Sequence, residues 1–247
     1  APNPGSMTYH GTNTYLVRTA SGLVVIDPGP DLPDHIETLS AQCGPKAAYI
    51  FLTHHHADHC GAAEALRERT GAKLVAAENS GYQGGKVDIR LADGESLAGF
   101  TALATPGHTE DHLCFQFERV IFTGDHVMGW ATTAVLAPEG NASRYLESLR
   151  RLVSVRARHF LPAHGPKIAH TQRYLTFLIA KAEEKERQLL STLARRPGCV
   201  EQIIAETYGE LSQDMRRVAR RTIEALLLCL ERTGKVIRED DTWRVLQ

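Results

Sequence analysis

The sequence lacks several features that would have pointed to a particular cellular setting. No hydrophobic run among its 247 residues approaches the roughly 20 residues that a membrane-spanning helix needs. The five cysteines are odd in number and contain no CxxC pair, which argues against a disulfide framework and favours reduced thiols. The formal net charge is only −1, so no overall field favours nucleic acid or a membrane surface. No basic and apolar signal peptide opens the sequence. We therefore expect a cytoplasmic protein without a membrane partner.

Apolar segments alternate with helical patterns in the first two thirds of the chain, and this alternation predicts helices packed against a sheet. Further along, three helical patterns precede a short hairpin, which is the element order of a winged helix-turn-helix. We therefore predict two domains, residues 1–170 and residues 171–247. The strands expected early are 14–19, 23–27, 47–52 and 73–76, with helices 33–42 and 62–69; the late helices are 171–195, 200–207 and 213–232, with a hairpin over 235–245.

Four histidines and an aspartate gather directly after the apolar run 47–52, in the pattern HxHxDH. On an extended segment His54 and His56 point to the same side. Asp58 and His59 would begin the following helix and face a second point nearby. Three isolated residues at other predicted strand ends complete the set, as a ligand for a first ion, a bridge, and a ligand for a second ion; they are His108, Asp125 and His164.

Imidazole nitrogens and carboxylate oxygens are zinc ligands, and catalytic zinc sites keep one position for water. Two ions roughly 3.5–4 Å apart can share a hydroxide that has lost its proton near neutral pH. A lone HxH pair is common on sheet surfaces, but four separate motifs in a consistent order favour a metal site. We expect two Zn²⁺ ions, with Mn²⁺ or Fe²⁺ as alternatives.

The motifs HxHxDH, TPGHT, TGD and PAHG, in this order over about residues 10–170, resemble the metallo-β-lactamase superfamily. The resemblance implies an αββα sandwich, an α/β fold, with a binuclear site at one edge of its sheets. Asp58 also orients or deprotonates the attacking water in many members of that family. Asp27 matches another acidic residue typical of the family, and is expected to accept a hydrogen bond near the histidine loop; a turn cap before Pro28 is the alternative. The implied ligands are His54, His56 and His108 for the first ion, Asp58, His59 and His164 for the second, and Asp125 as the bridge.

Further features resemble one subgroup. The oxygen-reducing di-iron branch carries a Glu at the position of His56, so His56 favours hydrolysis. Asp125 and His164 are 39 positions apart, too few for the inserted cap domain of RNA-processing and DNA-repair nucleases. The segments 11–17 and 129–133, with a C-terminal winged helix, resemble lactamase-beta-2-like proteins. The best-understood members of that subgroup are endoribonucleases selective for single strands.

Four arginines lie on one side of the helix predicted over 213–232, opposite an apolar stripe of helical period. Such side chains could bind phosphates. However, residues 171–247 hold 14 Lys and Arg against 12 Asp and Glu, a net charge of only +2. A solvated helix face or a dimer contact is therefore an equal alternative. The four are Arg216, Arg217, Arg220 and Arg221.

The resulting hypothesis is a dinuclear metal-dependent hydrolase that uses a bridging hydroxide, acting as a phosphodiesterase or endoribonuclease on single-stranded RNA. The first alternative is a thioester hydrolase of the glyoxalase II type, and a β-lactamase is a weaker one. A non-catalytic nucleic-acid-binding or scaffold protein is the alternative of a different class. The expected partner is single-stranded RNA or a small ester or thioester, and the oligomeric state stays open.

Overall fold

The computed structural model describes residues 1–246, without the side chain of Lys46. Contacts divide the chain into two compact units, each described here by itself. The first contains Ala1–Pro106, Asp111–Thr133 and Val155–Thr171. The second contains Gly107–Glu110, Ala134–Ser154 and everything from Gln172 onward. The separation into domains 1–170 and 171–247 stays a prediction.

The first sheet of unit 1 has the strand order β1-β2-β3-β4-β5. β1 and β2 form an antiparallel hairpin, and every later pair is parallel. Parallel neighbours need a crossover connection, and α1 and α3 lie in two of these connections. The bounds are β1 Tyr15–Thr19, β2 Gly22–Ile26, α1 Pro33–Cys43, a 3-10 turn Gly44–Lys46, β3 Ala47–Phe51, α2 Ala57–Cys60, α3 Ala63–Thr70, β4 Lys73–Ala77 and β5 Ile89–Leu91.

The second sheet has the order β10-β9-β8-β7-β6, with β10 parallel to β9 and the other pairs antiparallel. Both sheets are therefore mixed, and the fold is the αββα sandwich expected from the sequence. Its strands are β6 Ser96–Leu97, β7 Phe100–Ala104, β8 Leu113–Phe117, β9 Val120–Gly124 and β10 His159–Pro162.

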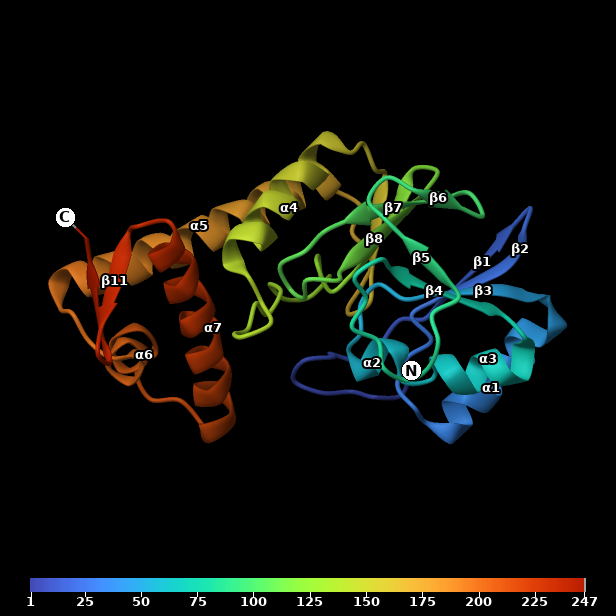
Figure 1. Ribbon diagram of the computed structural model, residues 1–247, viewed down its shortest axis with the longest axis horizontal. Coiled ribbons are helices and arrows are strands. Elements are labelled where there is room, and N and C mark those ends of the chain that lie inside the picture. The colour runs from blue at the N-terminus through green and yellow to red at the C-terminus, as the bar shows by residue number, and fades with distance from the viewer. Residues whose placement is uncertain (247) are drawn as a thin grey trace. The chain divides into compact units, whose positions relative to one another are not determined.

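Alternation of side chains along the strands builds the layers. Val25, Ile50 and Leu74 face outward and pack in one apolar cluster with residues of α1 and α3, which cover this face of the first sheet (Figure 1). The neighbouring residues face inward. Phe51 packs there in a second cluster with Phe115 of the other sheet. Because apolar side chains pack on both faces of the first sheet, the strands are held in place, and so are the first residues of the loops that follow their carboxyl ends.

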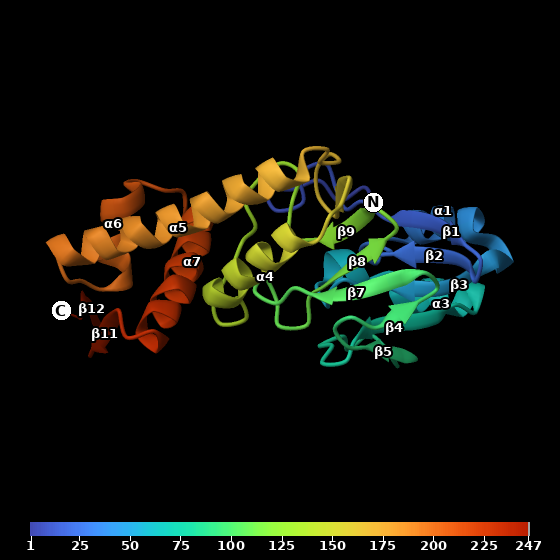
Figure 2. The same cartoon turned by 90° about the horizontal axis from the view of Figure 1, so that it is seen from above.

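The C-terminal part of unit 2 has its own apolar cluster. Leu227 of α7 packs there with Leu193 of α5, Ile204 of α6 and Trp243 of β12, and Figure 2 shows these elements gathered around one centre. This is the helical winged-helix region expected from the sequence. The remaining elements, which lie in unit 2 apart from Thr171 at the start of α5, are α4 Ala142–Ser154, α5 Thr171–Arg195, α6 Val200–Tyr208, α7 Gln213–Arg232, β11 Val236–Glu239 and β12 Thr242–Val245.

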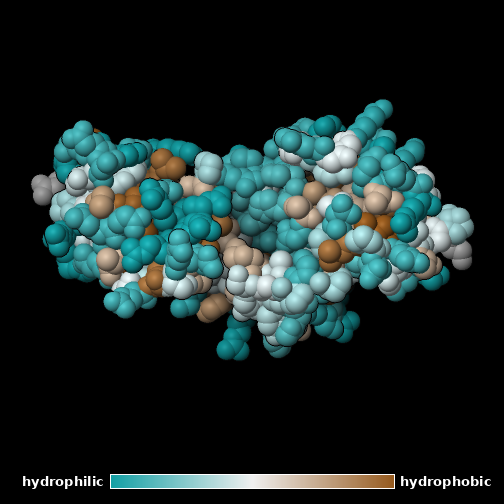
Figure 3. Space-filling model, turned by 90° about the horizontal axis from the view of Figure 1, so that it is seen from below, coloured by the Kyte–Doolittle hydropathy of each residue, from teal (hydrophilic) through white to brown (hydrophobic). Residues whose placement is uncertain are grey.

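On the face drawn in Figure 3, hydrophobic residues form small separate areas surrounded by hydrophilic ones. Among the described residues, no helix combines the length and the hydropathy that crossing a bilayer requires.

Candidate active site

The predicted ligands follow the carboxyl ends of four strands. Residues 54–59 come after β3, His108 after β7, Asp125 after β9 and His164 after β10. The structure brings all seven candidates together in overlapping groups, in each of which one ligand atom per residue lies within 4.8 Å of the others. The groups are His54 with His56 and His108, His54 with His59 and Asp125, and Asp58 with His59 and His164.

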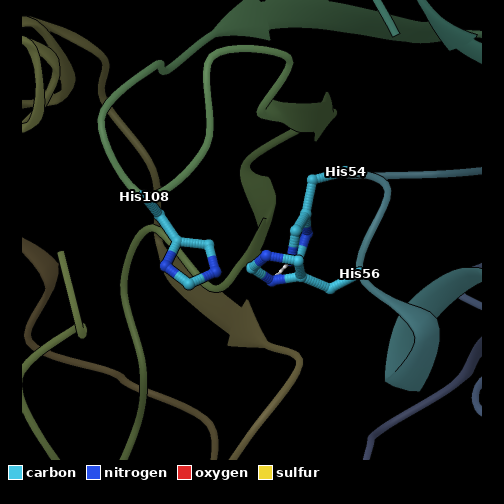
Figure 4. A group of neighbouring side chains, drawn as sticks. All are labelled: His54, His56 and His108. Atoms are coloured by element: carbon cyan, nitrogen blue, oxygen red, sulfur yellow. Dashed lines mark hydrogen bonds between the residues drawn. The ribbon is translucent and has the colours of Figure 1, made fainter. Parts of the chain in front are cut away.

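Three histidines form the first group, and Figure 4 shows their rings turned toward one another. Nε2 of His54 lies 3.0 Å from Nδ1 of His56, the contact drawn as a dashed line. His56 thus presents its Nδ1 atom to the group, whereas His54 presents Nε2. His54 and His108 are buried and His56 is partly exposed.

The third group, Asp58 with His59 and His164, lies next to the carboxylate of Asp125. Nε2 of His164 lies 3.2 Å from Oδ2 of Asp58 and 3.3 Å from Oδ1 of Asp125. Nε2 of His59 lies 3.5 Å from the same two oxygens. Asp125 also groups with His54 and His59, so its carboxylate lies close to histidines of both clusters.

A hydrogen-bonded chain that starts at Asp27 sets the proton position on His54. Oδ1 of Asp27 accepts the backbone N–H of Thr53 at 2.8 Å, and Oδ2 accepts the Thr53 hydroxyl at 2.7 Å. That hydroxyl has one proton and has donated it, so it accepts from Nδ1 of His54, 3.0 Å away. A neutral His54 therefore carries its proton on Nδ1 and presents the Nε2 lone pair to the group.

The same rule fixes three more rings. Nδ1 of His59 lies 2.9 Å from Oδ2 of Asp27, an acceptor. Nδ1 of His108 lies 2.8 Å from the carbonyl of Ala134, and Nδ1 of His164 lies 3.2 Å from the carbonyl of Gly11. An acceptor at Nδ1 demands a proton there, which leaves Nε2 as the ligand atom.

The nitrogen and oxygen atoms of the candidate ligands are suited to bind a cation. Nε2 of His59 and Nε2 of His164 are buried, and neither makes a hydrogen bond within the part of the chain that the structure describes. Burial by itself would lower the pKa of His59, but the charges of Asp125 and Asp27 raise it well above its ordinary value. Burial also lowers the pKa of His164, but its contacts with Asp58 and Asp125 outweigh burial and raise this pKa above its ordinary value. This corner of the site therefore attracts positive charge.

Asp58 is the more accessible of the two carboxylates, with a side chain 31% exposed against 11% for Asp125. Burial would raise the pKa of Asp58, but the contact with His164 and the charge of His59 bring it below its ordinary value. Asp58 is therefore a carboxylate near neutral pH, able to accept a hydrogen bond from water.

The segment 11–15 supports the loop that carries His164. The Asn13 side-chain amide donates to the carbonyls of Pro162 and Gly165, at 3.0 and 2.9 Å. The Tyr15 hydroxyl donates to the Pro162 carbonyl at 2.8 Å. The sequence resemblance singled out this segment without giving it a role, and the structure shows it next to the site.

Residues next to the candidate ligands make hydrogen bonds that link the loops around the site. His55 contacts buried Asp111 at 2.8 Å, and Asp111 also accepts the N–H of Gly81 at 3.0 Å. Nε2 of His112 accepts the Asp125 N–H at 3.2 Å. The buried Cys60 thiol donates to the His55 carbonyl, and burial raises its pKa to about 12. Sequence reasoning assigned no role to Thr53 or Asp111, because their partners lie far along the chain.

The four arginines of α7 have partners in the protein. Arg216 and Arg220 lie 3.4 and 3.5 Å from Glu201 of α6, and Arg220 also pairs with Glu224 at 3.0 Å. Arg217 lies 3.9 Å from Asp214. Arg221 differs, because its Nε donates to the Ala137 carbonyl at 2.7 Å. Carboxylates thus compensate three of the four charges locally.

Residues 7–88 match the model of the metallo-beta-lactamase superfamily, and residues 199–243 match the beta-lactamase associated winged helix domain. The lactamase-like protein nscB of Trichophyton rubrum is 32% identical over 86% of this chain and 71% of the relative. The atrochrysone carboxyl ACP thioesterase dmxR1 of a Cryptosporiopsis species is 32% identical over 96% of this chain and 80% of the relative.

A solved structure, a beta-lactamase domain protein from Burkholderia ambifaria, has the same fold. It superposes with a TM-score of 0.85 at 20% identity, over 99% of this chain and 89% of that one. The His and Asp groups are consistent with a dinuclear metal site, and this is the arrangement of a metal-dependent hydrolase. The chain belongs to the metallo-β-lactamase superfamily and carries a C-terminal beta-lactamase associated winged helix domain.

Proposed function

We propose that this chain is a dinuclear metal-dependent thioester hydrolase whose acyl substrate is attached to an acyl carrier protein. The observation that carries the proposal is the similarity to a carrier-protein thioesterase over 96% of this chain. It includes the winged-helix region, so it supports a common reaction more directly than the fold does. The thioester hydrolase that the sequence offered as an alternative thus has better support than RNA cleavage.

The proposed ligands are those that the sequence predicts. His54, His56 and His108 would hold one ion, and Asp125 would contact both ions. The second ion would be held by Asp58, His59 and His164. Zinc suits this set of nitrogen and oxygen donors, and manganese or iron also suits it.

Two cations held by these residues would lower the pKa of a water molecule and would polarise the thioester carbonyl. The protein itself fixes the orientation and the tautomer of the ligand side chains. Asp27 and Thr53 hold His54 and His59 in the tautomers that present Nε2. Asp58, partly exposed and ionised, accepts a proton from the attacking water. A new C–O bond forms between the water oxygen and the acyl carbon, the C–S bond breaks, and the sulfur leaves as a thiolate.

Hydrolysis of single-stranded RNA has weaker support. Its basis is the winged-helix region, whose arginines were candidates for phosphate contacts. Arg216 and Arg220 instead pair with Glu201. A phosphate would have to displace this carboxylate before it could bind there. The structure therefore does not favour the phosphate-binding hypothesis over an ordinary solvated helix face.

A substrate panel tests the proposal. The purified protein would be given an acyl chain on a carrier protein, the same acyl chain on coenzyme A, S-lactoylglutathione, a chromogenic β-lactam and labelled single-stranded RNA. We expect thiol release from the carrier-bound acyl chain, at least about tenfold faster in kcat/KM than from coenzyme A, a difference of 1.4 kcal/mol. A chelator should abolish this release.

Two variants serve as controls. Asp125→Ala should lose the thiol release, whereas Asp34→Ala, an exposed aspartate in the first turn of α1, should keep it. RNA cleavage that is lost in Asp125→Ala, with every thioester intact, would overturn the proposal in favour of the nuclease. A metal content below one ion per chain would refute the dinuclear site.

A further inference from the structure

The loop that carries His108 packs against the segment 134–145 and is hydrogen-bonded to it. Nδ1 of His108 contacts the Ala134 carbonyl at 2.8 Å, and the Gly107 carbonyl accepts the N–H of Asn141 at 2.8 Å. Gly107 has φ +138°, and a Cβ there would lie 2.3–2.5 Å from backbone and Cβ atoms of Tyr145. The position of His108 therefore depends on how residues 134–145 are held.

Residues 134–140 contain no helix or strand, so their backbone needs partners elsewhere. Ala137 gives both of its backbone groups to a single residue, 84 positions away. Its N–H donates to the Arg221 carbonyl at 3.0 Å, and its carbonyl accepts from Nε of Arg221 at 2.7 Å. Within the segment, the N–H of Gly140 donates to the Leu136 carbonyl at 2.7 Å.

Arg221 is set apart from the other arginines of α7. Arg216, Arg217 and Arg220 are exposed and pair with carboxylates, whereas Arg221 is half-buried and makes no ion pair among the described residues. A hydrogen bond from a charged donor is roughly twice as strong as a neutral one. Arg221 therefore makes a charge-assisted hydrogen bond to the Ala137 carbonyl, whereas the other three arginines use their charges on surface carboxylates.

We propose that Arg221 is a positioning residue for the metal site, acting through Ala137 and Ala134 on His108. α7 of the winged-helix region then has a task within the enzyme: it orients one ligand of the first ion. The proposal goes beyond the hydrolytic reaction, because it assigns a function to the C-terminal region. It is tested by metal binding, so its outcome is independent of which substrate is hydrolysed.

The test compares metal affinities of Arg221→Met and Arg221→Lys with the unaltered chain, by titrating Co²⁺ into apo-protein and following its visible absorption. Outer partners of metal-binding histidines contribute roughly 10- to 100-fold in affinity. We expect Arg221→Met to bind one of its two Co²⁺ ions with an affinity lowered by this factor, and to bind the other ion unchanged. Lys can still donate to the Ala137 carbonyl, so Arg221→Lys should recover part of the lost affinity. Arg232→Met, at the exposed end of the same helix, should bind cobalt as the unaltered chain does.

A double-mutant cycle with His108→Ala separates positioning from general stability. If Arg221 acts through His108, Arg221→Met should weaken cobalt binding in the unaltered background and add nothing in His108→Ala. Equal losses in both backgrounds would overturn the proposal. A lowered Tm without any change in cobalt affinity would overturn it as well, since this marks a merely structural contact. If Arg221→Met does not fold, the cycle is run with Arg221→Lys.

Discussion

The substitution Asp27→Asn should reverse the proton positions on two histidines at once. Asp27 has φ +48°, a conformation that Asn also tolerates, so the backbone should not be strained. The Thr53 N–H can only donate, and therefore keeps the amide oxygen at the place of Oδ1. The amide NH₂ then occupies the place of Oδ2. In the unaltered chain, Oδ2 accepts from the Thr53 hydroxyl and from Nδ1 of His59.

The consequence reaches both ions. An NH₂ group facing Nδ1 of His59 requires a lone pair there, which moves the proton of that ring to Nε2, the ligand atom. The Thr53 hydroxyl would accept from the amide and turn its own proton toward Nδ1 of His54, with the same result. Each outer partner is worth roughly 10- to 100-fold in metal affinity, or about 1.4–2.8 kcal/mol per ion.

The assay is competition against a chromophoric chelator, combined with ¹⁵N NMR of the imidazoles to determine the tautomers. Thr53→Val is the matched comparison, because it removes the acceptor of His54 and leaves Asp27 with His59. It should weaken the first ion only, and Thr53→Ser should weaken neither. If Asp27→Asn binds two ions as tightly as the unaltered chain, or if both rings keep the proton on Nδ1, the reasoning is wrong.

Two further predictions concern the loops around the site. Asn13→Ala removes two hydrogen bonds to the loop of His164, and should lower the free energy of unfolding by about 1–3 kcal/mol; denaturant titration measures this, and an unchanged midpoint would contradict it. Gly107→Ala should destabilise the protein more than Gly209→Ala. Both glycines have positive φ, but a Cβ at Gly107 meets the backbone of Tyr145, whereas a Cβ at Gly209 meets nothing within 4 Å. Thermal unfolding compares the two, and equal values of Tm would show that the loop yields at little cost.

The periodic parts of the fold were predictable from the sequence. The helices predicted over 171–195 and 213–232 have these bounds in the structure. Apolar stripes at helical spacing are local patterns, and their period is fixed by backbone geometry. The region 80–100 was predictable only as short pieces, because its strands β5 and β6 have three and two residues and depend on their neighbours.

The seven candidate ligands were predictable because each follows an apolar strand in a short motif, and strand ends meet at one edge. The sequence by itself thus determined the superfamily and the presence of a winged-helix region, and the residue types of the site stay a prediction. It left the use of the α7 arginines open. Glu201, which balances two of them, lies in another helix, and Ala137 lies 84 residues before Arg221.

Only the tertiary structure decided which atoms of the site can act. Nδ1 of His59 meets Asp27 across 32 residues, and Nδ1 of His164 meets Gly11 across 153. These contacts determine which nitrogen carries the proton and which one presents its lone pair. No local pattern encodes them, because the choice of nitrogen depends on an acceptor that chain folding brings into place.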